Sequence, residues 1–200
     1  MLKIYLVGKN KDVYCAYKKY CEKFNFVSIY EGNILDLDVD TIVSPANSFG
    51  FMDGGIDAIY RDYFGYFIQE QLQTKIIENH FGELLVGELE VIHTLDNKIK
   101  YIIAIPTLRV PTILPDDSVN AYLATRSLFI FLKYGFIEDA RANDIIKTIA
   151  IPGLCTGYGM MDAEKSAKQV CQAIEDILLY KLSFPVGIDE AINNHNFISK

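Results

Sequence analysis

Short apolar runs rich in β-branched residues alternate with stretches of helical periodicity along this 200-residue chain. This alternation predicts an α/β fold: a three-layer α/β/α sandwich around a mixed, largely parallel sheet of about six strands. The turn-like pair Asp96-Asn97 separates two of the runs and indicates an antiparallel hairpin within that sheet. The predicted strands cover residues 3–7, 26–30, 41–44, 89–93, 101–105 and 148–151.

Apolar stripes at helical spacing predict four helical regions, at residues 13–24, 56–79, 119–130 and 163–178. The second is expected to break near Gly65, and Asp116 or Asp117 can cap the third. The tail at 183–200 is expected to be a surface cap or a frayed end.

Half of the residues are apolar, which is enough for one well-buried domain over residues 1–200. The net charge of −7 argues against polymeric nucleic acid as the main ligand, because phosphate polymers require concentrated lysine and arginine. A single pyrophosphate remains compatible, since a few backbone N–H groups can hold it. No apolar run is long enough for a signal peptide or a membrane span, so we expect a cytoplasmic protein with no membrane partner.

The cysteines and histidines are scattered and show no metal-ligand spacing, so we expect neither a metal site nor a disulfide framework. Three of the cysteines fall on or beside apolar helix faces and are expected in the core. The fourth, Cys155, lies in a glycine-rich loop, but no histidine stands near it to activate a nucleophile. The cysteines expected in the core are Cys15, Cys21 and Cys171.

A polar, glycine-containing loop follows the strand predicted at 41–44. It carries Asn47 and the pair Gly54-Gly55, after which Asp57 opens a helix. An amide side chain, a backbone that a ligand can approach closely and a helix N-terminus are the parts that hold an anionic, hydroxyl-rich ligand. The loop therefore indicates a binding site.

A second strand–loop–helix junction spans residues 149–162. Loops after parallel strands meet at the carboxyl edge of the sheet, so the two loops together predict one nucleotide site. Neither loop contains Gly-Lys-Ser/Thr, which excludes a P-loop. Gly157-Tyr158-Gly159 is followed by Asp162 where a dinucleotide fingerprint requires a third glycine, so a Rossmann site is also excluded.

The residues of these loops resemble those of macrodomains, which are ADP-ribose-binding modules, and in particular a subgroup common in bacteria and their viruses. The resemblance covers residues 1–180. It rests on Glu31-Gly32-Asn33-Ile34, Ser44-Pro45-Ala46-Asn47, Gly54-Gly55-Ile56-Asp57, the segment 106–111, Pro152-Gly153-Leu154 and Thr156-Gly157-Tyr158-Gly159.

This resemblance implies that the ligand is ADP-ribose or a related NAD-derived nucleotide, free or carried by an ADP-ribosylated macromolecule, with no cofactor. If the chain is viral, the host cytoplasm is its expected location. The sequence departs from the family at Asn33, where an acid is usual, at the short glycine run after Asp53, and in a second loop one residue shorter. The implied ligand contacts are Asn33, Ile34, Ala46, Asn47, Gly54, Gly55, Ile56, Cys155, Thr156, Gly157, Tyr158 and Gly159.

The resemblance also makes Asn47 and Asp57 the candidate catalytic residues of an ADP-ribosyl hydrolase or an ADP-ribose 1''-phosphate phosphatase-like enzyme. Asp57 would orient or deprotonate the attacking water, with Asp53 as its rival. Structural roles compete: Asn47 can brace its own loop, and Asp57 can be a helix-dipole partner. A non-catalytic module that binds or sequesters the nucleotide is the alternative function, and a structural domain with a drifted pocket is a third.

Three other side chains near these motifs have open roles. Tyr158 either stacks on the distal ribose or fills a surface groove. For Arg109 we expect an ordinary salt bridge, and for Arg126 a buried ion pair.

Overall fold

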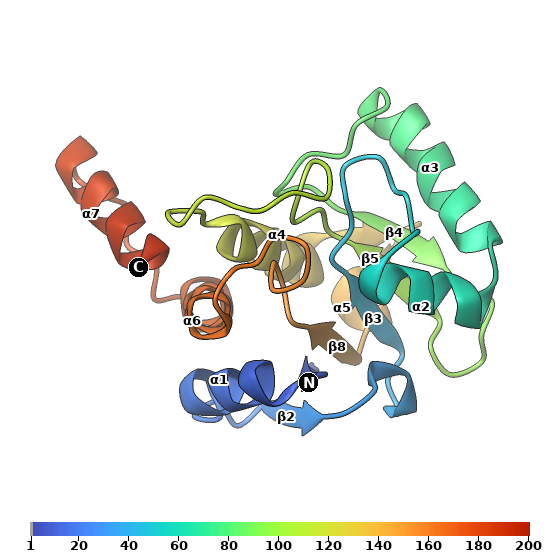
Figure 1. The fold of residues 1–200 in the computed structure, drawn as a ribbon, viewed down its shortest axis with the longest axis horizontal. Coiled ribbons are helices and arrows are strands. Elements are labelled where there is room, and N and C mark those ends of the chain that lie inside the picture. The colour runs from blue at the N-terminus through green and yellow to red at the C-terminus, as the bar shows by residue number, and fades with distance from the viewer. Residues whose placement is uncertain (1) are drawn as a thin grey trace.

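A computed structural model describes residues 2–200 and contains a six-stranded sheet in the order β2-β1-β8-β3-β5-β4 (Figure 1). Neighbouring strands are parallel except β4 and β5, which form the predicted antiparallel pair. The mixed, largely parallel sheet is therefore confirmed. The strands are β1 (Lys3–Gly8), β2 (Val27–Glu31), β3 (Thr41–Ser44), β4 (Glu90–His93), β5 (Tyr101–Ala104) and β8 (Thr148–Pro152).

The central strands are buried on both sides because each face of the sheet packs against its own apolar core. Alternate side chains of β8 divide between the cores: Ile149 and Ile151 enter one, and Ala150 enters the other. In β3, Val43 and Ile42 divide in the same way. Two cores on opposite faces of one sheet give the expected three layers.

Helices cover both faces of the sheet (Figure 1). The first core includes residues of α1 (Lys11–Cys21), α4 (Asn120–Tyr134) and α6 (Ala163–Ala173). The second includes residues of α2 (Gly55–Phe64) and α3 (Phe67–His80). Short elements complete the fold: the 3₁₀ turn Ile34–Asp36, α5 (Ala142–Ile145), the pair β6 (Phe136–Ile137) and β7 (Ala140–Arg141), and the π-helical turn Ile174–Leu178 that continues α6.

The predicted break near Gly65 is confirmed. Gly65 ends α2 at a φ of +107°, a conformation that side-chain-bearing residues rarely adopt, and α3 begins two residues later.

The expected cap of α4 is wrong. Val119, not Asp116 or Asp117, occupies the N-cap position, and its side chain makes no capping hydrogen bond. Gln169 of α6 takes over this role: its Oε1 accepts from the backbone N–H of Tyr122 at 3.1 Å, and its Nε2 donates to the carbonyl of Ser118 at 2.8 Å. Gln169 is fully buried, and it satisfies the buried N–H of Tyr122 and the half-buried carbonyl of Ser118.

The C-terminal tail is a helix, α7 (Ile188–Ser199), and not a frayed end. It extends beyond α6, at the left of Figure 1. Its last turn is attached to the domain, since Ser199 is buried and the carbonyl of Ile198 accepts from Gln169 at 3.3 Å. No helix within residues 2–200 is long and apolar enough to cross a membrane.

Gln169→Ala is expected to lower the free energy of unfolding by about 1–3 kcal/mol, because it leaves the buried N–H of Tyr122 and carbonyl of Ser118 without a partner. Urea denaturation followed by circular dichroism measures the change. Lys168→Ala, at the neighbouring exposed position of the same helix, is the control and should change stability by less than about 0.5 kcal/mol. Equal effects of the two substitutions would contradict this role of Gln169.

Candidate functional site

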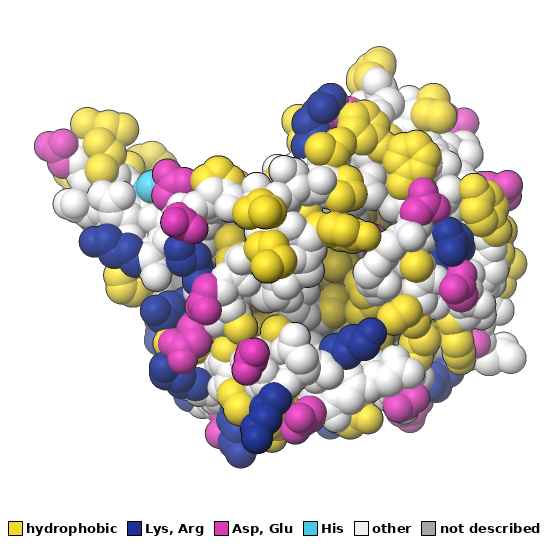
Figure 2. Space-filling model, in the orientation of Figure 1, with side chains coloured by type: hydrophobic (Ala, Val, Ile, Leu, Met, Phe, Trp, Pro, Cys, Tyr) yellow, Lys and Arg dark blue, Asp and Glu magenta, His cyan; other side chains and the backbone are white. Residues whose placement is uncertain are grey.

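The two loops singled out in the sequence line one cavity of about 300 Å³ at the carboxyl edge of the sheet. The loop after β3 contributes Gly54 to Asp57, and the loop after β8 contributes Pro152 to Gly159. Figure 2 shows a hollow in the middle of this face, with hydrophobic side chains around it. The expectation that both loops open onto one crevice is therefore met.

A second cavity, of about 360 Å³, continues from the first. Both are lined by Pro45, Gly54, Asp57, Leu108 and Tyr158. The second extends along the loop after β3, where Ala46, Asn47, Phe49, Phe51 and Asp53 line it together with Val110 and Pro111. The combined space suits an elongated ligand with two or more chemically different parts.

Tyr158 marks the boundary between the cavities. A Cβ placed on Gly54 would lie 2.5 Å from the Tyr158 hydroxyl oxygen, so this ring reaches across from the second loop to the first. The ring remains 58% exposed. A side chain at position 54 would require the Tyr158 ring to move, and a φ of +60° favours glycine at position 55.

The N-terminus of α2 opens onto the first cavity. Gly54, the N-cap residue, supplies no side-chain cap, and Gly55 and Ile56 follow it along the cavity wall. Tyr60 fixes the helix beneath β3 by donating its hydroxyl to the carbonyl of Val43 at 3.1 Å. Free first-turn N–H groups and the positive end of the helix dipole favour an anion here.

Asp57 lies at the floor of both cavities and is 7% exposed. The hydroxyl of Ser44, at the end of β3, donates to its Oδ1 at 2.6 Å. Burial raises the pKa of Asp57 from its ordinary 3.8 to about 6, while the hydrogen bond from Ser44 lowers it. Asp57 is thus a carboxylate that can change protonation state near neutral pH in a cavity.

Asn47 braces its own loop in this structure. Its Nδ2 donates to the carbonyl of Phe51 at 2.7 Å, and its Oδ1 accepts from the N–H groups of Phe49 and Phe51 at 3.1 and 3.3 Å. Asn47 also lines the second cavity. The bracing holds the loop in the shape that forms that wall.

Asn33 and Ile34 do not line either cavity. Asn33 caps the short turn after β2, accepting from the N–H of Leu35 at 3.2 Å, and Ile34 is buried in the second core. Residues that sequence reasoning missed stand closer: Lys9 and Asn10, directly after β1, line the first cavity. Both residues directly follow a predicted parallel strand, and this position alone would have placed them at the carboxyl edge of the sheet with the two loops.

The remaining charged candidates near the loops are paired. Asp53 accepts from Arg61 at 3.0 Å. Arg109 forms the expected salt bridge, a two-point contact with Glu83 at 2.6 and 3.1 Å. Neither side chain is therefore free to bind a ligand unless its ion pair opens.

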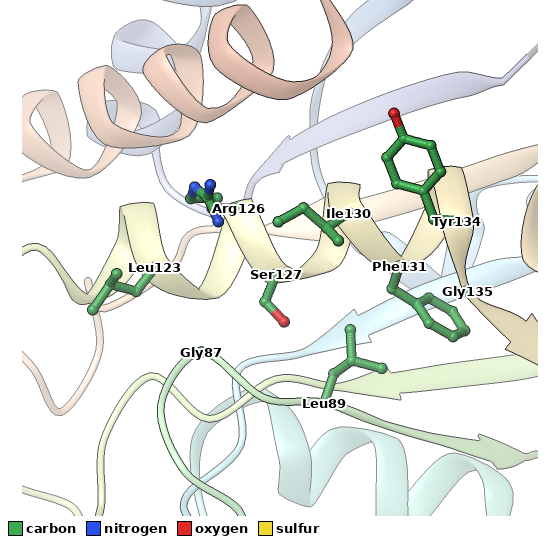
Figure 3. A pocket seen from close by; sticks show the side chains of 9 residues that line it. All are labelled: Gly87, Leu89, Leu123, Arg126, Ser127, Ile130, Phe131, Tyr134 and Gly135. Carbon is green, nitrogen blue, oxygen red and sulfur yellow. The ribbon is translucent and has the colours of Figure 1, made fainter. Parts of the chain in front are cut away.

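The expected ion pair of Arg126 is wrong: within residues 2–200 no carboxylate lies within 4 Å of its guanidinium. Arg126 instead lines a separate cavity of about 450 Å³ beside α4. Figure 3 shows α4, with Ser127 and Phe131, above the segment that carries Gly87 and Leu89.

The cysteine expectations hold in part. Cys21 and Cys171 are buried, but Cys15 is exposed because it falls on the outer side of α1. Cys155, Thr156, Gly157 and Gly159 line the first cavity, and burial raises the pKa of the Cys155 thiol to about 12. This pKa disfavours the thiolate that a nucleophile requires.

Asp57→Asn is expected to stabilise the ligand-free protein. Because the folded-state pKa of Asp57 is raised, its favourable contribution is complete below about pH 4 and is lost as the pH rises through about 6. The amide removes the cost of a buried charge, so the variant should gain on the order of 3 kcal/mol at about pH 7.5 and roughly half of that at about pH 5. Urea denaturation at the two pH values measures this; a gain independent of pH would contradict it.

Comparison with known proteins agrees with this architecture. The family model described as a macro-like domain matches residues 17–194. A macro domain-containing protein from Caldanaerobacter subterraneus is 28% identical over 153 residues, which cover 76% of this chain and 81% of that protein.

Two solved structures share the fold. A variant macrodomain from Oceanobacillus iheyensis, solved with ADPR, is similar with a TM-score of 0.61 and 18% identity, covering 83% of this chain and 88% of that one. The macrodomain of Mycobacterium tuberculosis DarG has a TM-score of 0.59 and 20% identity, covering 73% and 88% of the two chains. Since the family model covers most of its length, this chain belongs to the macro-like domain family.

Proposed function

We propose that the protein binds ADP-ribose, or an ADP-ribosyl derivative, across the two joined cavities and hydrolyses the derivative. The observation that carries this proposal is the meeting of the two loops around Asp57. Family membership and the ADPR-containing relative support the choice of ligand. An ADP-ribosylated macromolecule is the substrate class for the hydrolytic reaction.

The pyrophosphate would lie in the first cavity, against backbone N–H groups of the loop Thr156–Gly159 and of the start of α2. Lys9 is the one lysine or arginine that lines either cavity within residues 2–200. A single lysine together with backbone donors suits one diphosphate and explains how a chain of net charge −7 can hold it.

The distal ribose would lie between Tyr158 and Asp57, with the group to be released in the second cavity. There Asp57, once ionised, would accept a proton from a water molecule that attacks the anomeric carbon. The water oxygen bonds to that carbon while the bond from the carbon to the leaving oxygen breaks. The proton taken up by Asp57 then passes to the leaving oxygen, so the products are ADP-ribose and the released acid or alcohol. A pKa of about 6 leaves Asp57 mostly ionised at neutral pH.

A non-catalytic binding module is the second candidate, and the state of Asn47 favours it. The Oδ1 of this amide and one of its two Nδ2 hydrogens are engaged with the backbone of its own loop, so only one N–H donor remains for a ribose hydroxyl. Calorimetry that detects ADP-ribose binding, with no product after prolonged incubation at high protein concentration, would select this function over hydrolysis.

Binding is tested by thermal shift and calorimetry with ADP-ribose, with AMP and ribose 5-phosphate as partial ligands. At about a hundred times its dissociation constant, ADP-ribose should stabilise the protein by about 2.7 kcal/mol. Lys9→Ala should weaken binding about tenfold by removing a charge-assisted contact, whereas Lys11→Ala, at an exposed position of α1, should not. No shift with any adenine nucleotide would contradict the proposed ligand.

Catalysis is tested by the release of ADP-ribose from ADP-ribosylated protein and from ADP-ribose 1''-phosphate. Asp57→Asn should reduce turnover by about a hundredfold or more while ADP-ribose binding persists. Asp53→Asn, on the same loop and paired with Arg61, is the matched control and should retain activity. The wild-type rate should rise as the pH increases through about 6 and then level off; full activity of Asp57→Asn would exclude this mechanism.

A further inference from the structure

Two cysteines outside the proposed nucleotide site face each other where α1 packs against α6. Cys21 is the last residue of α1, and Cys171 lies in the last turns of α6. The Cys171 thiol donates to the carbonyl of Tyr20 at 3.2 Å, and the Cys21 thiol donates to the carbonyl of Ala167 at 3.8 Å. The sulfur of Cys171 therefore contacts the residue next to Cys21, and the sulfur of Cys21 contacts the residue one helical turn before Cys171.

These two contacts place both thiols in the same part of the seam between α1 and α6. Small residues allow this approach, because Ala16 and Ala167 are both buried in the core between the helices. Each thiol already contacts the opposite helix, so we expect a bond between them to need mainly rotation of the two side chains.

The two thiols differ in their access to solvent. Cys21 is completely buried, whereas Cys171 is 7% exposed and forms part of the wall of a cavity of about 610 Å³ between α1, α6 and α7. A small reagent that enters this cavity meets Cys171 first. Cys21 does not line this cavity.

The electrostatic surroundings also distinguish the two thiols. The neighbouring Cys21 and the Lys23 ammonium lower the pKa of Cys171, although burial and Glu175 oppose this. The neighbouring Cys171 and burial raise the pKa of Cys21. Lys23 also pairs with Glu175 at 2.6 Å, which keeps its ammonium beside the cavity. A thiol of lowered pKa beside a cation, next to a second thiol, is the arrangement of oxidisable cysteine pairs.

We propose that Cys171 and Cys21 are a modification site: a peroxide oxidises Cys171, and Cys21 then closes an intramolecular disulfide. The Cys171 thiolate attacks one peroxide oxygen, the O–O bond breaks, and the products are a sulfenic acid and hydroxide, which takes up a proton to form water. The Cys21 sulfur then displaces the sulfenic hydroxyl as a second water. In total, two thiols and one hydrogen peroxide give one disulfide and two waters.

The test uses the full chain with Cys15→Ser, because exposed Cys15 would form intermolecular disulfides. After treatment with hydrogen peroxide and alkylation of the remaining thiols, two of the three thiols should be lost. Peptide mass spectrometry should find Cys21 joined to Cys171 and Cys155 alkylated, and dithiothreitol should restore all three. Three intact thiols, or a disulfide that includes Cys155, would overturn the proposal.

The order of the two steps is tested by trapping the sulfenic acid with dimedone. In Cys15→Ser/Cys21→Ser the adduct should form at Cys171, because no thiol remains to displace the hydroxyl. In Cys15→Ser/Cys171→Ser, Cys21 should stay unlabelled. Labelling of Cys21 but not of Cys171 would overturn the assignment of Cys171 as the first thiol. The disulfide measurement retains both native cysteines, so it does not depend on whether these variants fold.

Discussion

The insertion of β8 between β1 and β3 determines where the site lies. In the paired register, Val7 stands beside Pro152, and Thr41 stands beside Ile149. Since all three strands are parallel, their following loops leave the sheet at one edge. Lys9, the Gly54–Asp57 turn and the Thr156–Gly159 loop become neighbours although they lie far apart in sequence.

The pattern of apolar and polar residues predicted the strands and helices well, because each of them is determined by residues close together in sequence. The run at 41–44 is a strand of four buried residues, and Gly65 breaks the helical region. Strand order is different: β8 is the last strand in sequence but lies in the middle of the sheet, and no periodicity encodes this. The expectation that the two loops meet came from the rule that loops after parallel strands share the carboxyl edge of a sheet, and the family resemblance supplied the ligand.

The expectations that failed concern partners distant in the chain. The cap of α4 comes from Gln169, which lies 47 residues beyond Tyr122. The prediction from the nearby Asp116 and Asp117 was wrong because it considered only residues close in sequence. Arg126 was expected to find a buried acid, yet the structure places it at a cavity. The polar run Asn193-Asn194-His195-Asn196 lies within α7 and made residues 188–199 resemble a frayed end. In the site, the positions of Asp57 and the glycines were predictable, but the burial that raises the pKa of Asp57 depends on the assembled fold.

The helices α1 and α6 connect the nucleotide cavity to the thiol pair. The first turn of α1 carries Val13, which lines the first cavity, and its last residue is Cys21. The loop Thr156–Gly159 leads into α6, which carries Cys171. At a rise of about 1.5 Å per residue, eight residues of helix separate Val13 from Cys21 by about 12 Å. Oxidation therefore involves no residue that lines the nucleotide cavities, and any effect on the ligand has to pass through the packing of α1 against α6.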